Sequence, residues 1–189
     1  TTSDSALKAG ETATITFTLS EASTDFAEGD ITFSGGSLDN FTAVSSTVYT
    51  AVFTPTPNST VNGEISVTSD KFTDAAGNNN EVSNIVTLTV DTVEPTISIA
   101  SDVSELKAGE IATLTITLSE SSTDFVLDDI TATGGSITAF SGSGTSYQAT
   151  FTPDDNFTGT AEINVSSPKF VDAAGNNNEV SNIVTLTVD

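Results

Sequence analysis

The sequence contains no cysteine, histidine, tryptophan or methionine, and its four basic residues are all lysine. The lack of cysteine excludes a disulfide framework. Without histidine or cysteine, the chain lacks the usual general base, the usual nucleophile pair and the usual transition-metal ligands. Tryptophan, a common platform for sugar rings, is missing as well. We therefore expect that the protein is not an enzyme.

Positive charge is scarce. Four basic residues stand against 26 acidic ones, which gives a net charge of −22. Such a chain has no basic surface to neutralise phosphates, which excludes nucleic acid and anionic membrane surfaces as partners. No apolar run approaches the ~20 residues that span a bilayer, so we expect no membrane insertion. The high charge also favours a monomer.

An internal repeat organises the whole chain. The stretch DAAGNNNEVSNIVTLTVD at residues 74–91 recurs without a change at residues 172–189. Shorter landmarks recur with nearly the same offset, among them LKAGE, LSE, STDF, GGS and FTP. We predict two domains, residues 1–91 and 92–189. Because Thr1 aligns with Ala100, the first strand of repeat one is expected to be truncated.

Each repeat alternates apolar and polar residues in short segments. Ala13, Ile15, Phe17 and Leu19 share one face of the clearest segment, which has the period of two of a half-buried strand. Similar strands are predicted around residues 49–53, 65–67 and 86–90, separated by turn-forming residues. The sequence therefore predicts an all-β protein of two tandem immunoglobulin-like β-sandwich domains. The connection around Pro95 contains no glycine and is predicted to be stiff.

Several motifs together resemble a known family. VDTVEPT at the boundary, AGEIATLTITLSE in the second repeat and FTDAAGN near the end of the first resemble the bacterial Ig-like extender repeats of large secreted adhesins, including RTX-type biofilm adhesins. The resemblance implies a spacer on the bacterial cell surface, stiffened by calcium at the junctions between repeats. The glycine-rich nonapeptide calcium repeat of complete adhesins of this type does not occur in the chain.

Acidic residues gather in loops that an Ig-like fold brings to one pole. Ca²⁺ takes about six to eight oxygen ligands, and converging carboxylates repel one another unless a cation joins them. We predict a calcium site at the junction, with a weaker or vacant counterpart in repeat one. The candidate ligands at the junction are Asp91, Glu120, Asp124, Asp172 and Asn176, and those in repeat one are Glu21, Asp25, Asp74 and Asn78.

Plain turn chemistry is the alternative for these loops, since Asp, Asn and Gly are the ordinary residues of turns. Asp129, like Asp30, is a candidate second-tier ligand or a solvated residue at a strand edge. Asp154 and Asp155 are expected to be solvated.

Two functions fit the sequence. The first is a structural extender of a bacterial cell-surface adhesin, extracellular, with the neighbouring repeats of the same chain as its partners. The second is an adhesive module that binds a glycan or a host protein directly through its loops. Variation between the copies would favour the second, but differences such as PTP at residues 55–57 against PDD at 153–155 bring no aromatic cluster.

Overall fold

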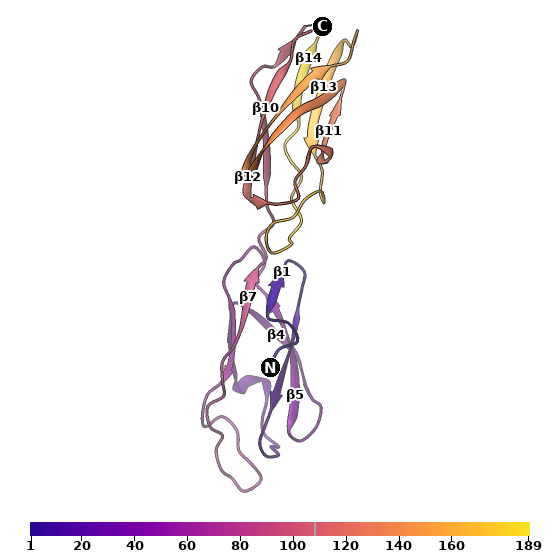
Figure 1. Ribbon diagram of the computed structural model, residues 1–189. Helices are drawn as coiled ribbons and strands as arrows, with labels where there is room; N and C mark the ends of the chain where they lie inside the picture. The colour runs from indigo at the N-terminus through magenta and orange to yellow at the C-terminus, as the bar shows by residue number, and fades with distance from the viewer. Residues whose placement is uncertain (108) are drawn as a thin grey trace. The chain divides into compact units, whose positions relative to one another are not determined.

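The computed structural model describes residues 1–107 and 109–189. It divides into two compact units, Thr1–Val93 and Glu94–Asp189. Each is built of β-strands, with one short 3₁₀ turn at Glu28–Asp30 and one at Leu127–Asp129 (Figure 1). The predicted all-β class is confirmed. No helix in the described part of the chain is long and apolar enough to cross a membrane.

The first unit pairs two sheets. One has the strand order β1-β7-β6-β3 and the other β2-β5-β4. The strands are β1 (Ala6–Lys8), β2 (Ala13–Thr18), β3 (Ile31–Ser34), β4 (Gly36–Ala43), β5 (Val48–Pro55), β6 (Gly63–Val67) and β7 (Val86–Asp91). β1 and β7 pair in parallel, and the other pairs are antiparallel.

The second unit repeats this plan with two changes: β8 is added, and one long strand, β12, takes the place of β4 and β5. Its sheets have the orders β11-β13-β14-β9 and β12-β10-β8. The strands are β8 (Ile97–Ser101), β9 (Glu105–Leu106), β10 (Ala112–Ser122), β11 (Ile130–Thr133), β12 (Gly135–Pro153), β13 (Gly159–Val165) and β14 (Val184–Val188). β8 pairs with one edge of β10. In the first unit, β2 corresponds to β10, and the same edge of β2 carries only an isolated bridge between Thr2 and Ile15.

The cores follow the predicted alternation. Ala112, Leu114, Ile116 and Leu118 are at most 2% exposed, and the polar residues between them face outward. Because successive side chains of a strand point to opposite faces, this pattern buries one face of each sheet against the other. Each unit has its own cluster of aliphatic and aromatic side chains.

Aromatic rings hold the loops that carry the candidate ligands. Phe125 packs edge-on against Tyr147 and Phe170, with ring centroids 5.1 Å apart in both pairs. The Tyr147 hydroxyl donates to the carbonyl of Ser122 at 3.2 Å. Phe26 and Tyr49 repeat this arrangement in the first unit, with centroids 5.0 Å apart. The residue that precedes each phenylalanine, Asp124 or Asp25, is thereby fixed beside the core.

Candidate metal centre

The Asp172 carboxylate organises the turn that follows it. Its Oδ1 accepts hydrogen bonds from the backbone N–H groups of Ala174, Gly175 and Asn176 at 2.7 to 2.9 Å. Its Oδ2 accepts from the Asn176 side-chain amide at 2.9 Å. Gly175 has a φ of 88°, which favours glycine. Asp172 and Asn176 thus make the hydrogen bonds of a tight turn. Metal binding by these two residues stays a prediction.

Asp74 has the same role in the first unit. It accepts from the backbone N–H groups of Ala76 and Asn78 at 2.9 and 2.8 Å, and from the Asn78 side-chain amide at 2.7 Å. These donors stabilise the ionised form, and the Asn78 side chain contributes most to a pKa of Asp74 below the ordinary 3.8. The two DAAGNNN turns are therefore built alike.

Asp25 and Asp124 connect two loops within their units. Asp25 accepts from the Ser23 hydroxyl at 2.7 Å and from the Thr73 backbone N–H at 3.0 Å. The Thr73 N–H is the largest cause of a pKa of Asp25 below 3.8. Asp124 Oδ1 accepts in the same way from the Ser122 hydroxyl and from the Val171 N–H, at 2.6 and 3.1 Å. Asp25 thereby connects the loop after β2, and Asp124 the loop after β10, to the residue just before the DAAGNNN turn of the same unit.

Asp129 and Asp30 cap the short 3₁₀ turns. Asp129 Oδ2 accepts from the Val126 backbone N–H at 2.9 Å, and Asp30 Oδ2 accepts from the Ala27 N–H at 2.8 Å. Each carboxylate accepts a backbone N–H that the short turn itself leaves without a partner. A side chain that is only solvated at a strand edge would make no such hydrogen bond.

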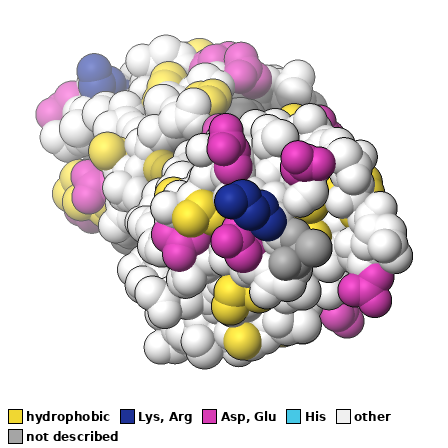
Figure 2. Space-filling view, turned by 90° about the horizontal axis from the view of Figure 1, so that it is seen from above, with side chains coloured by type: hydrophobic (Ala, Val, Ile, Leu, Met, Phe, Trp, Pro, Cys, Tyr) yellow, Lys and Arg dark blue, Asp and Glu magenta, His cyan; other side chains and the backbone are white. Residues whose placement is uncertain are grey.

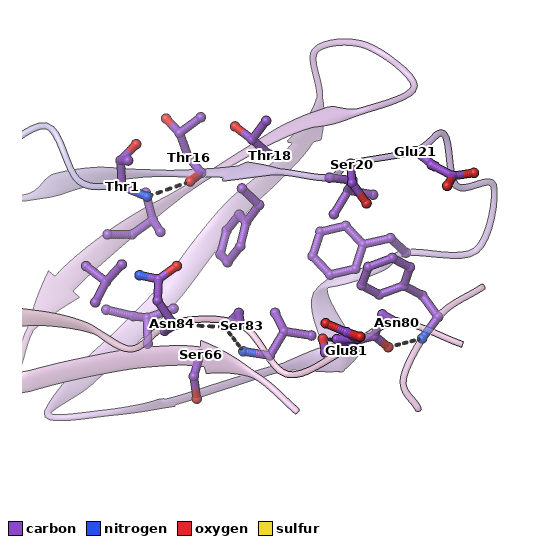
Figure 3. A pocket seen from close by; sticks show the side chains of 18 of the residues that line it. Thr1, Thr16, Thr18, Ser20, Glu21, Ser66, Asn80, Glu81, Ser83 and Asn84 are labelled. Atoms are coloured by element: carbon purple, nitrogen blue, oxygen red, sulfur yellow. Dashed lines mark hydrogen bonds between the residues drawn. The ribbon is translucent and has the colours of Figure 1, made fainter. Parts of the chain in front are cut away.

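Glu120 lies near Asp172 in the second unit, with one carboxylate oxygen of each residue within 4.8 Å of the other. Their counterparts in the first unit, Glu21 and Asp74, line one groove together with Asn78. Figure 3 labels Glu21 at one end of this groove. Asp91 ends β7 of the first unit and accepts from the Val93 N–H at 3.2 Å. Its contribution to a junction site remains a prediction.

The pair Glu120 and Asp172 meets part of what calcium requires. Two carboxylates at this separation repel each other, and a hard divalent cation prefers oxygen ligands of this kind. The pair would supply two of the roughly six to eight oxygens that Ca²⁺ takes. Asp172 also holds its own turn, but its Oδ2 accepts one hydrogen bond and keeps a lone pair for a cation. Asp124 and Asp129 do not belong to the close carboxylate group found among the described residues, so they fit a supporting role better than direct coordination. The donor set fits Ca²⁺ in chemistry but is incomplete within this unit.

Comparison with known proteins assigns both units to one family. A sequence model described as a bacterial Ig-like domain matches residues 1–90 and again residues 91–188. The chain belongs to the bacterial Ig-like domain family. This confirms the family that the boundary and turn motifs resemble. No curated protein matches the sequence.

Bacterial adhesins are among the solved structures that are similar to this chain, and FdeC shares its fold. The Escherichia coli adhesin FdeC is 16% identical with a TM-score of 0.55, and the match covers all of this chain and 62% of FdeC. The Yersinia pseudotuberculosis adhesin InvE is 17% identical with a TM-score of 0.40, and 57% of it is covered. Invasin, an integrin-binding bacterial protein, is 13% identical with a TM-score of 0.48 over 39% of its chain. The chain therefore spans less than two thirds of these structures.

Sequence reasoning missed the asparagine that closes the long loop of each Ig-like domain. Asn178 Oδ1 accepts from the N–H groups of Lys169 and Phe170 at 2.7 and 3.1 Å, and its Nδ2 donates to the carbonyls of Ser166 and Glu179 at 3.0 and 2.7 Å. Asn80 makes the same set of bonds in the first domain. The exact repetition of residues 74–91 was the one signal in the sequence that this segment matters. It could not show which of the three consecutive asparagines closes the loop.

The surface of this family member is acidic. Figure 2 shows acidic side chains spread over the visible face with few basic ones between them, in line with the net charge of −22. Surfaces of one sign repel one another within a Debye length of about 8 Å at physiological salt.

Proposed function

We propose that this pair of Ig-like domains is a spacer in a bacterial cell-surface adhesin, located outside the cell, with calcium held by the acidic loops where one repeat follows another. The repetition carries the proposal: the loop and final strand at residues 74–91 recur unchanged at 172–189, and the other strands recur with the same pattern. A module that repeats its plan, and whose differing loops bring no aromatic cluster, supports a mechanical role better than a ligand surface. Membership in the bacterial Ig-like family also supports this role.

Charge and the linker support the same function. A strong negative charge keeps neighbouring modules soluble and apart. The sequence between Asp91 and Pro95 contains no glycine, and Pro95 fixes one backbone angle. A cation bound at the junction would remove further freedom from this connection.

The proposed ligands are Asp91, Glu120 and Asp172. The close approach of the last two carboxylates favours a cation, because binding one relieves their repulsion. Bound calcium would supply the charge that keeps these loops together. The protein's part is to fix the carboxylates in advance, which the backbone donors around Asp172 do.

Calcium binding is tested by thermal unfolding of the chain in millimolar calcium and in chelator. A ligand present at one hundred times its Kd stabilises a domain by about 2.7 kcal/mol. For a domain of this size we expect the melting temperature to rise by roughly 10–20 °C. Small-angle scattering should show a narrower distribution of interdomain distances when calcium is present.

Matched variants locate the site. Glu120→Gln and Asp91→Ala should abolish the calcium-dependent shift, whereas Asp128→Asn removes an exposed carboxylate nearby and should leave it unchanged. Glu21→Gln, the counterpart of Glu120→Gln, should have little effect because the first site is predicted to be weak or vacant. If calcium changes neither observable, the loops are turns alone. Glycan or host-protein binding by the pair would then favour the adhesive-module alternative.

A further inference from the structure

Four asparagines of the chain stand in the pattern Asn-X-Ser/Thr, the sequon that accepts N-linked sugars. They are Asn40, Asn58, Asn156 and Asn164. So short a pattern also arises by chance in a chain rich in asparagine and threonine, so the setting of each sequon has to distinguish them. Asn58 and Asn156 are counterparts in the two repeats, whereas the other two have no asparagine at the matching position of the other repeat.

The loop that holds Asn58 differs almost completely between the repeats. Residues 56–63 read TPNSTVNG, and the matching residues 154–161 read DDNFTGTA. The two segments share the same residue at two positions, the asparagine and the threonine two residues after it. These are the two residues that define a sequon. The sequence around them varies while the acceptor pattern stays.

Both loops have the same local structure. The loop joins β5 to β6 in the first unit and β12 to β13 in the second. The N–H of Thr56 donates to the carbonyl of Gly35 at 3.0 Å, and the matching bond in the second unit has the same length. Asn58 and Asn156 follow with φ values of 50° and 62°. The two asparagines therefore occupy equivalent positions in exposed turns.

Turn geometry explains the asparagines but not the threonines. Asparagine tolerates a positive φ better than most residues, so the turn alone favours it at both positions. Thr60 and Thr158 are exposed, and among the described residues neither hydroxyl has a hydrogen-bond partner. The side-chain amides of Asn58 and Asn156 are likewise exposed and free within the described part of the chain. The folded chain thus presents every polar side-chain group of these two sequons to solvent.

The fold uses the other two sequons itself. Asn164 lies within β13, opposite Thr131 of β11, and the next residue, Val165, is fully buried. Asn40 lies within β4, and the Thr42 hydroxyl donates to the Asn40 carbonyl at 3.1 Å. A transferase must reach the backbone of a sequon as well as its side chains, and a strand held in a sheet does not offer that backbone.

We propose that Asn58 and Asn156 are acceptor sites for an N-linked sugar, and that the donor is a sugar activated as a diphosphate ester. The side-chain amide nitrogen forms a bond to the anomeric carbon of the sugar. The bond from that carbon to the diphosphate oxygen breaks, the diphosphate leaves with the electron pair, and the amide proton passes to a base of the transferase. The sites do not depend on calcium, so they stand or fall separately from the proposed spacer function.

The test offers the folded chain 1–189 to two transferases in separate reactions. One is a soluble enzyme with a nucleoside diphosphate hexose, and the other is a membrane enzyme with a polyprenyl diphosphate oligosaccharide. Peptide mass spectrometry should show sugar on both proposed asparagines in at least one reaction, and the reaction identifies the donor. The peptides that contain Asn40 and Asn164 should stay unmodified until the chain is unfolded. A synthetic peptide of residues 153–160 serves as the control for transferase activity.

Matched variants separate acceptor function from turn structure. Asn58→Gly keeps a residue that adopts a positive φ readily and removes the amide. Thr60→Val keeps the β-branched shape and removes the hydroxyl, whereas Thr60→Ser keeps the hydroxyl. We expect Asn58→Gly and Thr60→Val to abolish sugar on the first loop and leave Asn156 modified, and Thr60→Ser to remain modified on both. No sugar in either reaction, equal modification of Asn40 or Asn164 in the folded chain, or a modified Thr60→Val loop would each overturn the proposal.

Discussion

Replacing Asn178 with alanine should unfold the second domain at much lower temperature. The Asn178 side chain is buried, 1% exposed, and makes four hydrogen bonds that close the loop between β13 and β14. Alanine can make none of them. The loop carries Asp172, so its closure also positions the candidate metal ligands.

The magnitude follows from the groups left unpaired. The backbone N–H of Phe170 makes its bond to Asn178 in a buried position, and a buried donor without a partner costs about 1–3 kcal/mol. The N–H of Lys169 is partly exposed and reaches water more easily, so it adds less. We expect a loss of about 2–4 kcal/mol in the free energy of unfolding. For a domain of this size that lowers the melting temperature by roughly 10–30 °C.

The measurement is denaturant unfolding of the chain, with hydrogen exchange of the amides in the paired strands β13 and β14 reporting on the second domain. Asn177→Ala is the matched control, because its side chain is exposed and a surface change of this kind stays within about 0.5 kcal/mol. Asn80→Ala should lower the stability of the first domain less, since Asn80 is only half-buried. If Asn178→Ala and Asn177→Ala are equally stable, the closing role assigned to Asn178 is wrong.

The remaining predictions concern acid stability and core geometry. The N–H of Thr73 lowers the pKa of Asp25, so this carboxylate stabilises the first domain above about pH 4, and its contribution disappears as the pH falls through the folded-state pKa. Unfolding followed from pH 7 to pH 2 should show this loss, and Asp25→Asn should flatten the profile. A Cβ at Gly135 would lie 2.5 Å from the ring of Phe151, so Gly135→Ala should lower the free energy of unfolding by about 1–3 kcal/mol. Gly29→Ala, where a Cβ meets nothing within 4 Å, should leave stability nearly unchanged in the same denaturant assay.

The sequence was sufficient for the repeat, the fold class and most of the core. Alternation along a strand is a local property, so the buried set Ala112, Leu114, Ile116 and Leu118 could be read directly from the residues. The same alternation through β2 and the residue after Thr18 correctly places Phe17 and Leu19 against the core. How far those two side chains are covered depends on the neighbouring strand, which periodicity cannot supply.

For the acidic loops, the sequence decided less than the tertiary structure did. The sequence indicated which carboxylates gather in the loops, and the fold brings Glu120 and Asp172 close together. The sequence could not distinguish carboxylates that are available to a ligand from carboxylates that accept backbone N–H groups. Asp129 caps a 3₁₀ turn and Asp124 braces two loops, because the donors they meet come from backbone positioned by folding.

Residue type and spacing therefore determined that this chain forms two acidic β-sandwiches of one family, because strand alternation, turn residues and exact repetition are written locally. Tertiary structure alone decided which polar groups are satisfied. Asn178 became a closing residue, and Asp124 a brace between two loops, through contacts that folding creates, such as the hydrogen bond from the Val171 N–H, 47 residues along the chain from Asp124. Such contacts depend on the whole fold, and no local pattern encodes them.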